Sequence, residues 1–100
     1  MTNVYVPTTS FHDLSKAERF GSLVYLTDGR VDPFKLNELY TQCVMRMLDS
    51  HSEDYILMCG HTVLNVVATL AFSHRHSRVQ VLMWSAQRQD YEVRRLKFAV

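Results

Sequence analysis

The sequence predicts an α/β fold in which a mostly parallel sheet ends in an antiparallel C-terminal edge strand. Three observations predict it: unbroken apolar runs of strand length at 23–26 and 55–59, a helical pattern after each run, and two strand-like segments joined by a polar loop. This succession describes a small Rossmann-like β-α-β-α-β-β layer. At 100 residues, 47% of them hydrophobic, the chain is expected to form a single domain, 1–100, with one core.

The N-terminal third begins with an expected arm, residues 1–13. Within it Val4 to Val6 is either a short edge strand or part of the arm, because a proline follows. Ser15 and Glu18 have the spacing of a capping box and predict a short helix that ends at Gly21. Leu23 to Leu26 is predicted to be the first core strand, covered on both faces.

The next segment is predicted to be a helix that begins at Asp32-Pro33 and runs to about Asp49. Aspartate can cap a helix, and proline at the first helical position loses no hydrogen bond. Apolar residues then recur at three- and four-residue steps. An alternative is that Asp28-Gly29 forms a hairpin turn, which would place Val31 in a returning strand.

The middle of the chain holds the best candidate for the central strand, Tyr55 to Cys59. Gly60-His61-Thr62 then turns the chain into a second helix that ends at about His74. Nearly all of its side chains are apolar. We therefore expect this helix to pack on the sheet with one face and to be covered on another by its neighbouring helix or a second subunit.

The C-terminal quarter is predicted to be a hairpin of strands 79–84 and 91–98. Tyr91 and Val93 alternate with one parity and the apolar residues after them with the other, so a bulge near Arg94-Arg95 would place them all on one buried face. Charged side chains suit an exposed edge strand. Trp84 lies among apolar neighbours and is expected to be a core residue.

The cysteines indicate a reducing compartment. Cys43 and Cys59 lie apart in apolar stretches without CxxC spacing, which is typical of buried, reduced thiols. We expect a cytoplasmic protein. The sequence has no run of roughly 20 apolar residues as a membrane span requires, and the pattern at its N-terminus leads us to expect no secretion signal.

Charge is uneven along the chain, although the net charge is only +1. Residues 74–100 hold six Lys or Arg against two Asp or Glu, whereas residues 1–73 hold five against eight. The basic quarter offers a candidate surface for a partner or for weak nucleic-acid binding. Its arginines are Arg75, Arg78, Arg88, Arg94 and Arg95.

An anion site is predicted at the carboxyl ends of the first two apolar strands, where ligands bind open parallel sheets. Arg30, Gly60, His61 and Thr62 are its candidate residues, for a nucleotide or another phosphorylated ligand. Neither segment has the glycine density of a dinucleotide or Walker loop. His74 and His76 are too close, without carboxylate or thiolate, for a good metal site. No catalytic residue, metal or cofactor is predicted.

One pattern resembles a known group of proteins. It consists of Asp54-Tyr55-Ile56-Leu57 leading to Gly60, an apolar helix, Arg78-Val79 opening a strand that ends in Trp84, and a last strand that begins at Tyr91. Over residues 20–98 it resembles small uncharacterised accessory proteins of tailed bacteriophages. The resemblance implies a protein that acts in the infected host's cytoplasm, often by binding and redirecting or blocking a host factor.

The leading hypothesis is therefore a non-enzymatic, phage-type accessory factor that binds or inhibits a host protein. It also includes self-association through the second helix or the C-terminal edge strand. The runner-up is binding of a nucleotide or phosphorylated ligand at the strand ends. The third hypothesis is weak nucleic-acid binding by the basic quarter.

Overall fold

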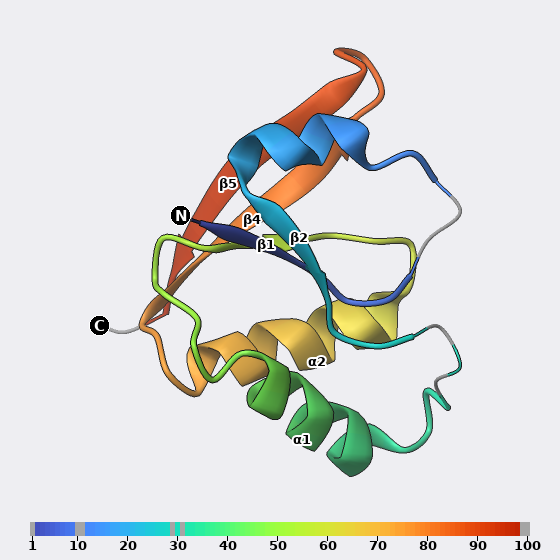
Figure 1. Cartoon of the computed structure of the whole chain (residues 1–100), viewed down its shortest axis with the longest axis vertical. Coiled ribbons are helices and arrows are strands. Elements are labelled where there is room, and N and C mark those ends of the chain that lie inside the picture. The colour runs from blue at the N-terminus through green and yellow to red at the C-terminus, as the bar shows by residue number, and fades with distance from the viewer. Residues whose placement is uncertain (1, 10–11, 29, 31, 99–100) are drawn as a thin grey trace.

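Five strands form one sheet in the computed structural model, which describes residues 2–9, 12–28, 30 and 32–98. They lie in the spatial order β2-β1-β3-β4-β5 (Figure 1). The first four run parallel, and β5 is antiparallel to β4. The predicted α/β class is confirmed. The strands are β1 (Asn3–Val6), β2 (Ser22–Tyr25), β3 (Tyr55–Leu57), β4 (Arg78–Ser85) and β5 (Asp90–Lys97).

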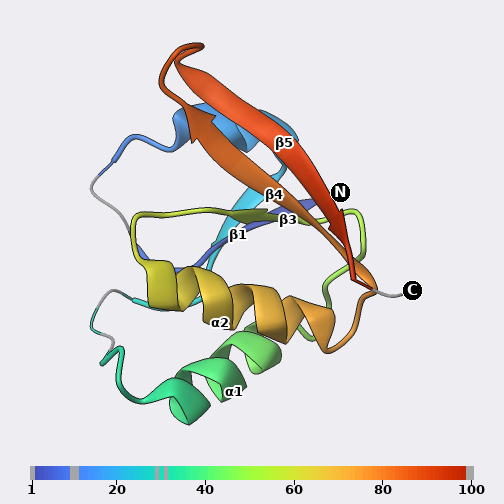
Figure 2. The same ribbon diagram turned by 180° about the vertical axis from the view of Figure 1, so that it is seen from behind.

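Helices cover the sheet on both faces. The views in Figures 1 and 2 show α1 (Leu36–Arg46) and α2 (Thr62–Ser73) side by side below the sheet and the 3₁₀ helix η1 (Ser15–Phe20) on its opposite side. Alternate strand residues therefore enter different apolar clusters. Tyr5 and Ile56 pack in the cluster that holds α1 and α2, whereas Val4 and Leu57 pack with η1. The sheet thus divides the core into two layers.

The N-terminal segment is an inner strand, which corrects the expectation of an arm or edge strand. Val4, Tyr5 and Val6 are at most 2% exposed, and β1 pairs with β2 on one side and β3 on the other. The segment 23–26 is in turn displaced to the edge of the sheet as β2, where Tyr25 is 37% exposed. Its two faces are partly covered, since Val24 packs in the layer of α1 and α2 and Leu23 packs in the layer of η1. Only β3 is central, as predicted.

The short helix η1 forms without the predicted capping box. Leu14 occupies the N-cap position, and the Asp13 carboxylate, not a serine hydroxyl, accepts a backbone N–H, that of Ser15, at 2.9 Å. The predicted end of the helix is confirmed, because the Gly21 N–H donates to the Glu18 carbonyl. Glycine is required there, since an added Cβ would lie 2.4 Å from the Thr2 carbonyl oxygen.

The helix α1 begins later and ends earlier than predicted. Asp32 closes a turn instead of capping the helix: its Oδ1 accepts the Phe34 N–H, and its carbonyl accepts the Lys35 N–H. Helical structure runs only from Leu36 to Arg46. The alternative of a returning strand falls on Val31, which lies outside the described residues.

The C-terminal hairpin and α2 are confirmed, but the bulge is not. Pairing between β4 and β5 is continuous from Ser85↔Asp90 to Arg78↔Lys97. No bulge is needed because both faces of the sheet are covered. Tyr91 packs in the η1 layer, and Phe98, of the other parity, packs in the α1 and α2 layer.

Candidate functional site

A cavity of about 500 Å³ lies at the carboxyl ends of β1 and β3. These parallel strands are neighbours, and the sheet order reverses between them: the chain leaves β1 for β2 on one side and leaves β3 for β4 on the other. Open α/β sheets bind ligands at this switch point. The lining comprises Val6, His12, Asp13, Leu14, Lys16, Leu57, Met58, Cys59, Gly60, Trp84 and Tyr91.

The wall on the hairpin side is aromatic. Trp84 and Tyr91 lie opposite each other on β4 and β5, with ring centroids 5.1 Å apart and an edge-to-face angle of 72°. Tyr91 is buried, but Trp84 is 46% exposed, so the expectation that it is a core residue is wrong. Burial, and secondarily the charge of Asp13, raises the pKa of Tyr91 above its ordinary value.

The opposite rim is polar and comes from the segment at the start of η1. The Lys16 ammonium donates to the Gln89 carbonyl at 2.5 Å and lies 5.8 Å from the centroid of the Trp84 ring. Hydrogen bonds from Ser15, the backbone N–H first, lower the pKa of Asp13. The rim therefore presents an ammonium beside a carboxylate, with the imidazole of His12 along the same segment.

The third wall is the turn between β3 and α2, and Asn65 holds it in place. The Asn65 side chain accepts the Cys59 N–H at 3.0 Å and donates to the Cys59 carbonyl at 2.8 Å. Cys59 is half-buried and lines the cavity, which corrects the expectation that both thiols are buried. Cys43 is a core thiol as expected, and burial raises its pKa to about 11.

The anion site predicted from sequence is not assembled as one cluster. Gly60 lines the cavity, but Arg30, His61 and Thr62 do not. Arg30 follows β2, which β1 separates from β3, and its backbone N–H donates to Asp28. His61 is the N-cap of α2 and Thr62 its first residue, so both serve the helix start. The cavity residues that sequence reasoning missed are chiefly His12, Asp13 and Lys16.

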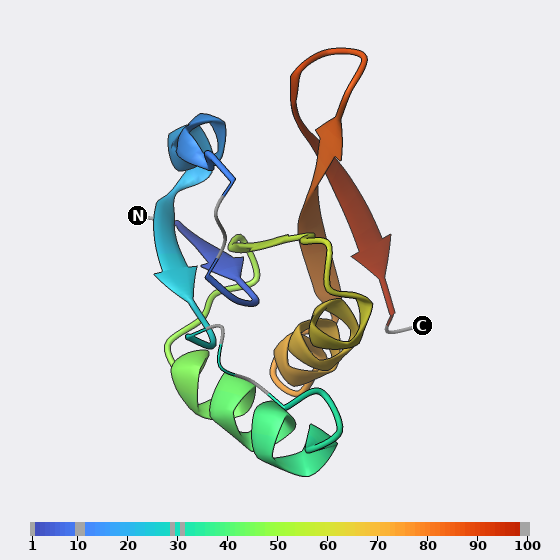
Figure 3. The same ribbon diagram turned by 90° about the vertical axis from the view of Figure 1, so that its right-hand side faces the viewer.

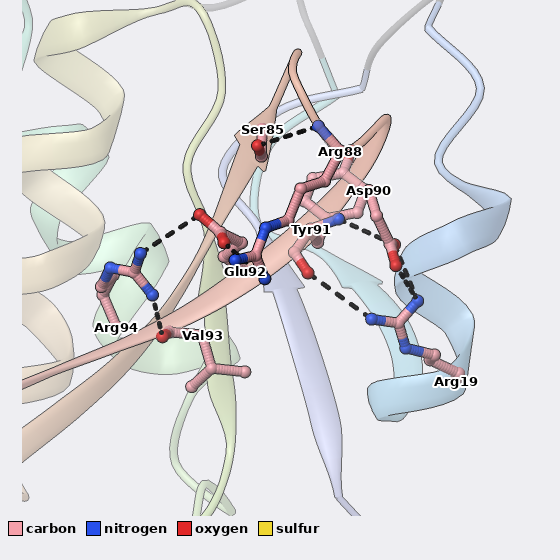
Figure 4. A network of polar contacts seen from close by, with 8 residues as sticks. All are labelled: Arg19, Ser85, Arg88, Asp90, Tyr91, Glu92, Val93 and Arg94. Carbon is pink, nitrogen blue, oxygen red and sulfur yellow. Dashed lines mark hydrogen bonds and ion pairs between the residues drawn. The ribbon is translucent and has the colours of Figure 1, made fainter.

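The five predicted basic residues also do not form one surface. Arg94 and Arg95 lie on opposite faces of β5, because they are consecutive in a strand. Arg88 and Arg94 both pair with Glu92, at 3.2 and 3.1 Å (Figure 4). The remaining placements are Arg78 with Glu53, Arg95 with the Gln80 side chain, and Arg75 exposed after α2. Acidic or amide partners thus engage four of the five.

A clamp between η1 and the hairpin keeps the cavity walls together. Arg19 donates to both carboxylate oxygens of Asp90, at 2.7 and 2.8 Å, and reaches the Tyr91 carbonyl (Figure 4). These hydrogen bonds lower the pKa of Asp90. The sequence separation of more than 70 residues left no local signal for this contact. Among the described residues, no group of three His, Cys, Asp or Glu side chains could hold a metal ion.

Comparison with known proteins places the chain in a family. The family model described as Phage Pam3 gp32-like protein matches residues 2–98. The chain belongs to this family. The resemblance to phage proteins found in the sequence is therefore confirmed, and it extends over almost the whole chain. No curated protein and no solved structure matches the chain. Among the described residues, no helix combines the length and apolarity needed to cross a bilayer.

Proposed function

We propose that this phage-family protein is a binding protein whose cavity holds a nucleobase-bearing small molecule, a nucleoside or nucleotide. The observation that carries the proposal is the cavity's position, at the β1/β3 switch point, together with its aromatic wall. The proposed site thus keeps the predicted place at the carboxyl ends of strands, but of the predicted residues only Gly60 lines it.

The shape and lining of the cavity favour a flat ring. A volume of about 500 Å³ is within the range of small-molecule sites. The exposed part of Trp84 offers a surface for stacking, and base–aromatic stacking contributes about 1–3 kcal/mol. Met58 and Leu57 add apolar surface that excludes water from the ring.

The polar rim supplies opposite hydrogen-bonding roles. The Asp13 carboxylate accepts hydrogen bonds, as an exocyclic amine or a ribose hydroxyl would require. The Lys16 ammonium can donate three hydrogen bonds, and within the described part of the chain it donates one, to the Gln89 carbonyl, so it can also serve a ring carbonyl or a phosphate. A ligand with both donors and acceptors around a flat ring therefore fits this rim better than a phosphate alone.

Trp84 makes the test direct, because it is the only tryptophan of the chain. Titration with nucleosides, nucleoside monophosphates and inorganic phosphate should give saturable fluorescence changes for the ring-bearing compounds. The same compounds should raise the temperature of unfolding. If no nucleoside or nucleotide changes either signal up to about 1 mM, a concentration that would still detect binding of about 4 kcal/mol, the proposal is wrong.

Two variants that each remove one positive charge distinguish a direct contact of Lys16 with the ligand from the effect of net charge. Lys16→Met should weaken nucleotide binding about tenfold, the effect of losing one charge-assisted hydrogen bond of about 1.5 kcal/mol. Lys35→Met is the matched control, because Lys35 is exposed before α1 and does not line the cavity. Arg30→Ala and His61→Ala test the anion position predicted from sequence and should leave binding unchanged.

Binding of a host protein is a second candidate, supported by one feature of α2. Val66 and Leu70 lie one turn apart and are 53% and 54% exposed, which is unusual for aliphatic side chains beside a packed helix face. Such a contact would take place in the host cytoplasm. The wild-type chain should capture a protein from host lysate, and the double variant Val66→Asp/Leu70→Asp should lose it. The control Thr41→Asp, at an exposed position of α1, should still capture it. Equal capture by the wild type and both variants would count against this function.

A further inference from the structure

The edge strand β5 has a free side that is long enough to pair. It is the last strand of the sheet, eight residues long, and β4 is its only strand neighbour among the described residues. The opposite edge, β2, has only four residues. Figure 3 shows β5 at the outside of the molecule, with no helix over its outer edge. An edge of this length presents a row of unpaired N–H and C=O groups that can accept a further strand.

Backbone geometry identifies the groups that face outward. The Phe98 N–H donates toward β4, to the Ser77 carbonyl at 2.9 Å. Because N–H and C=O groups alternate between the two edges of an antiparallel strand, those of the odd-numbered residues Tyr91, Val93 and Arg95 face away from β4. Arginine side chains reach the first two carbonyls from outside, which agrees with this assignment.

We propose that two copies of this chain pair through β5, antiparallel and two-fold symmetric, in the register centred on Val93. A two-fold axis perpendicular to the sheet brings the same edge of both copies into contact. It also places the corresponding faces of the two sheets on the same side. This register places Glu92 opposite the partner's Arg94, twice, and Tyr91 opposite the partner's Arg95. The outward N–H and C=O groups of Val93 then meet those of the partner's Val93.

Charge selects this register over its neighbours. Centring the pair on Arg94, Glu92 or Arg95 would place that residue opposite its own copy. Centring it on Tyr91 would place Asp90 opposite the partner's Glu92. Like charges directly opposite each other destabilise a strand pair, whereas opposite charges contribute about 0.2–1 kcal/mol each. The order of charges along β5 is therefore self-complementary in one register.

The contacts that must be exchanged are few. In the single chain Arg94 donates to the Val93 carbonyl at 3.0 Å and pairs with Glu92 of the same strand at 3.1 Å. On pairing, the partner's Val93 N–H replaces the first contact and the partner's Glu92 replaces the second. The Arg19 contact with the Tyr91 carbonyl, at 3.5 Å, must also give way, to the partner's Arg95 N–H. The Arg94 side chain is 60% exposed, so it can reorient without disturbing the core.

Light scattering after size exclusion, over about 1 µM to 1 mM protein, tests the pairing. The wild-type chain should form a dimer. Arg94→Glu should raise the dissociation constant of this dimer at least tenfold, because the two attractive pairs with the partner's Glu92 become repulsive. Glu92→Arg should act in the same direction. The double variant Glu92→Arg/Arg94→Glu should restore dissociation to within about threefold of wild type, since the charges are merely exchanged.

Controls keep the result specific to β5. Arg75→Glu carries the same charge change on the exposed segment after α2 and should leave the dimer unchanged. Circular dichroism must show each variant folded, and the double variant tests the charge pairs even if one single variant unfolds. A monomer at every concentration overturns the proposal. So does a dimer that Arg94→Glu leaves intact, or one that only Val66→Asp/Leu70→Asp disrupts.

Discussion

Asp54 joins the N-terminal strand to the centre of the sheet, and its removal should be costly. The carboxylate is fully buried and accepts two backbone hydrogen bonds, from Asn3 at 2.9 Å and from His51 at 2.8 Å. Hydrogen bonds to a charged group contribute about 1.5–3 kcal/mol each. His51 is exposed and Asn3 is half-buried, so water can partly replace the acceptor, and the lower value applies to both. Asp54→Ala should therefore lose about 3 kcal/mol of unfolding free energy.

The matched substitution Asp54→Asn separates hydrogen bonding from side-chain volume. Asparagine retains one acceptor oxygen but turns its amide NH₂ toward the other backbone N–H. We expect a loss of at least about 1.5 kcal/mol, one charge-assisted bond. Because this chain has 100 residues, the alanine variant should melt roughly 12–24 °C below wild type.

Urea unfolding followed by Trp84 fluorescence and circular dichroism gives both free energies. Asp49→Ala is the control, because this exposed carboxylate lies in the same connection and should change stability by no more than about 0.5 kcal/mol. The reasoning is refuted if Asp54→Ala is as stable as Asp49→Ala, since the two hydrogen bonds to the Asp54 carboxylate would then contribute nothing.

Three further variants test other parts of the structure. The Thr8 hydroxyl is buried without a hydrogen-bond partner in the described structure, so Thr8→Val should raise stability by about 1 kcal/mol in urea unfolding; a loss would contradict this. Asn65→Leu removes both hydrogen bonds to the Cys59 backbone. It should cost about 2 kcal/mol and weaken nucleotide quenching of Trp84 fluorescence. Arg19 lowers the pKa of Asp90 in the folded state. The ion pair therefore stabilises the fold above the pKa of about 4 that Asp90 has in the unfolded chain, and this stabilisation is lost progressively as the pH falls below that value. The stability difference between wild type and Arg19→Met should therefore shrink in acid unfolding below about pH 4, and a constant difference would exclude this linkage.

Local patterns in the sequence determined several elements correctly. The strand β3, the helix α2 and the β4–β5 hairpin each depend on residues close together in the chain, whose apolar spacing records which side is buried. The apolar run at Tyr55 was correctly expected to be central. Gly60, one of the residues of the predicted anion site, lines the cavity at the carboxyl end of that strand, and ligand binding there stays a prediction.

Only the tertiary structure decided which strand lies inside. Val4 to Val6 and Leu23 to Leu26 are apolar runs of similar length, and their spacing carries no information about sheet order. The same holds for the cavity rim, where Lys16 meets the Gln89 carbonyl 73 residues away. Strand pairing and such contacts depend on the joint packing of segments far apart in sequence, so a pattern read within one segment predicts its type but not its neighbours.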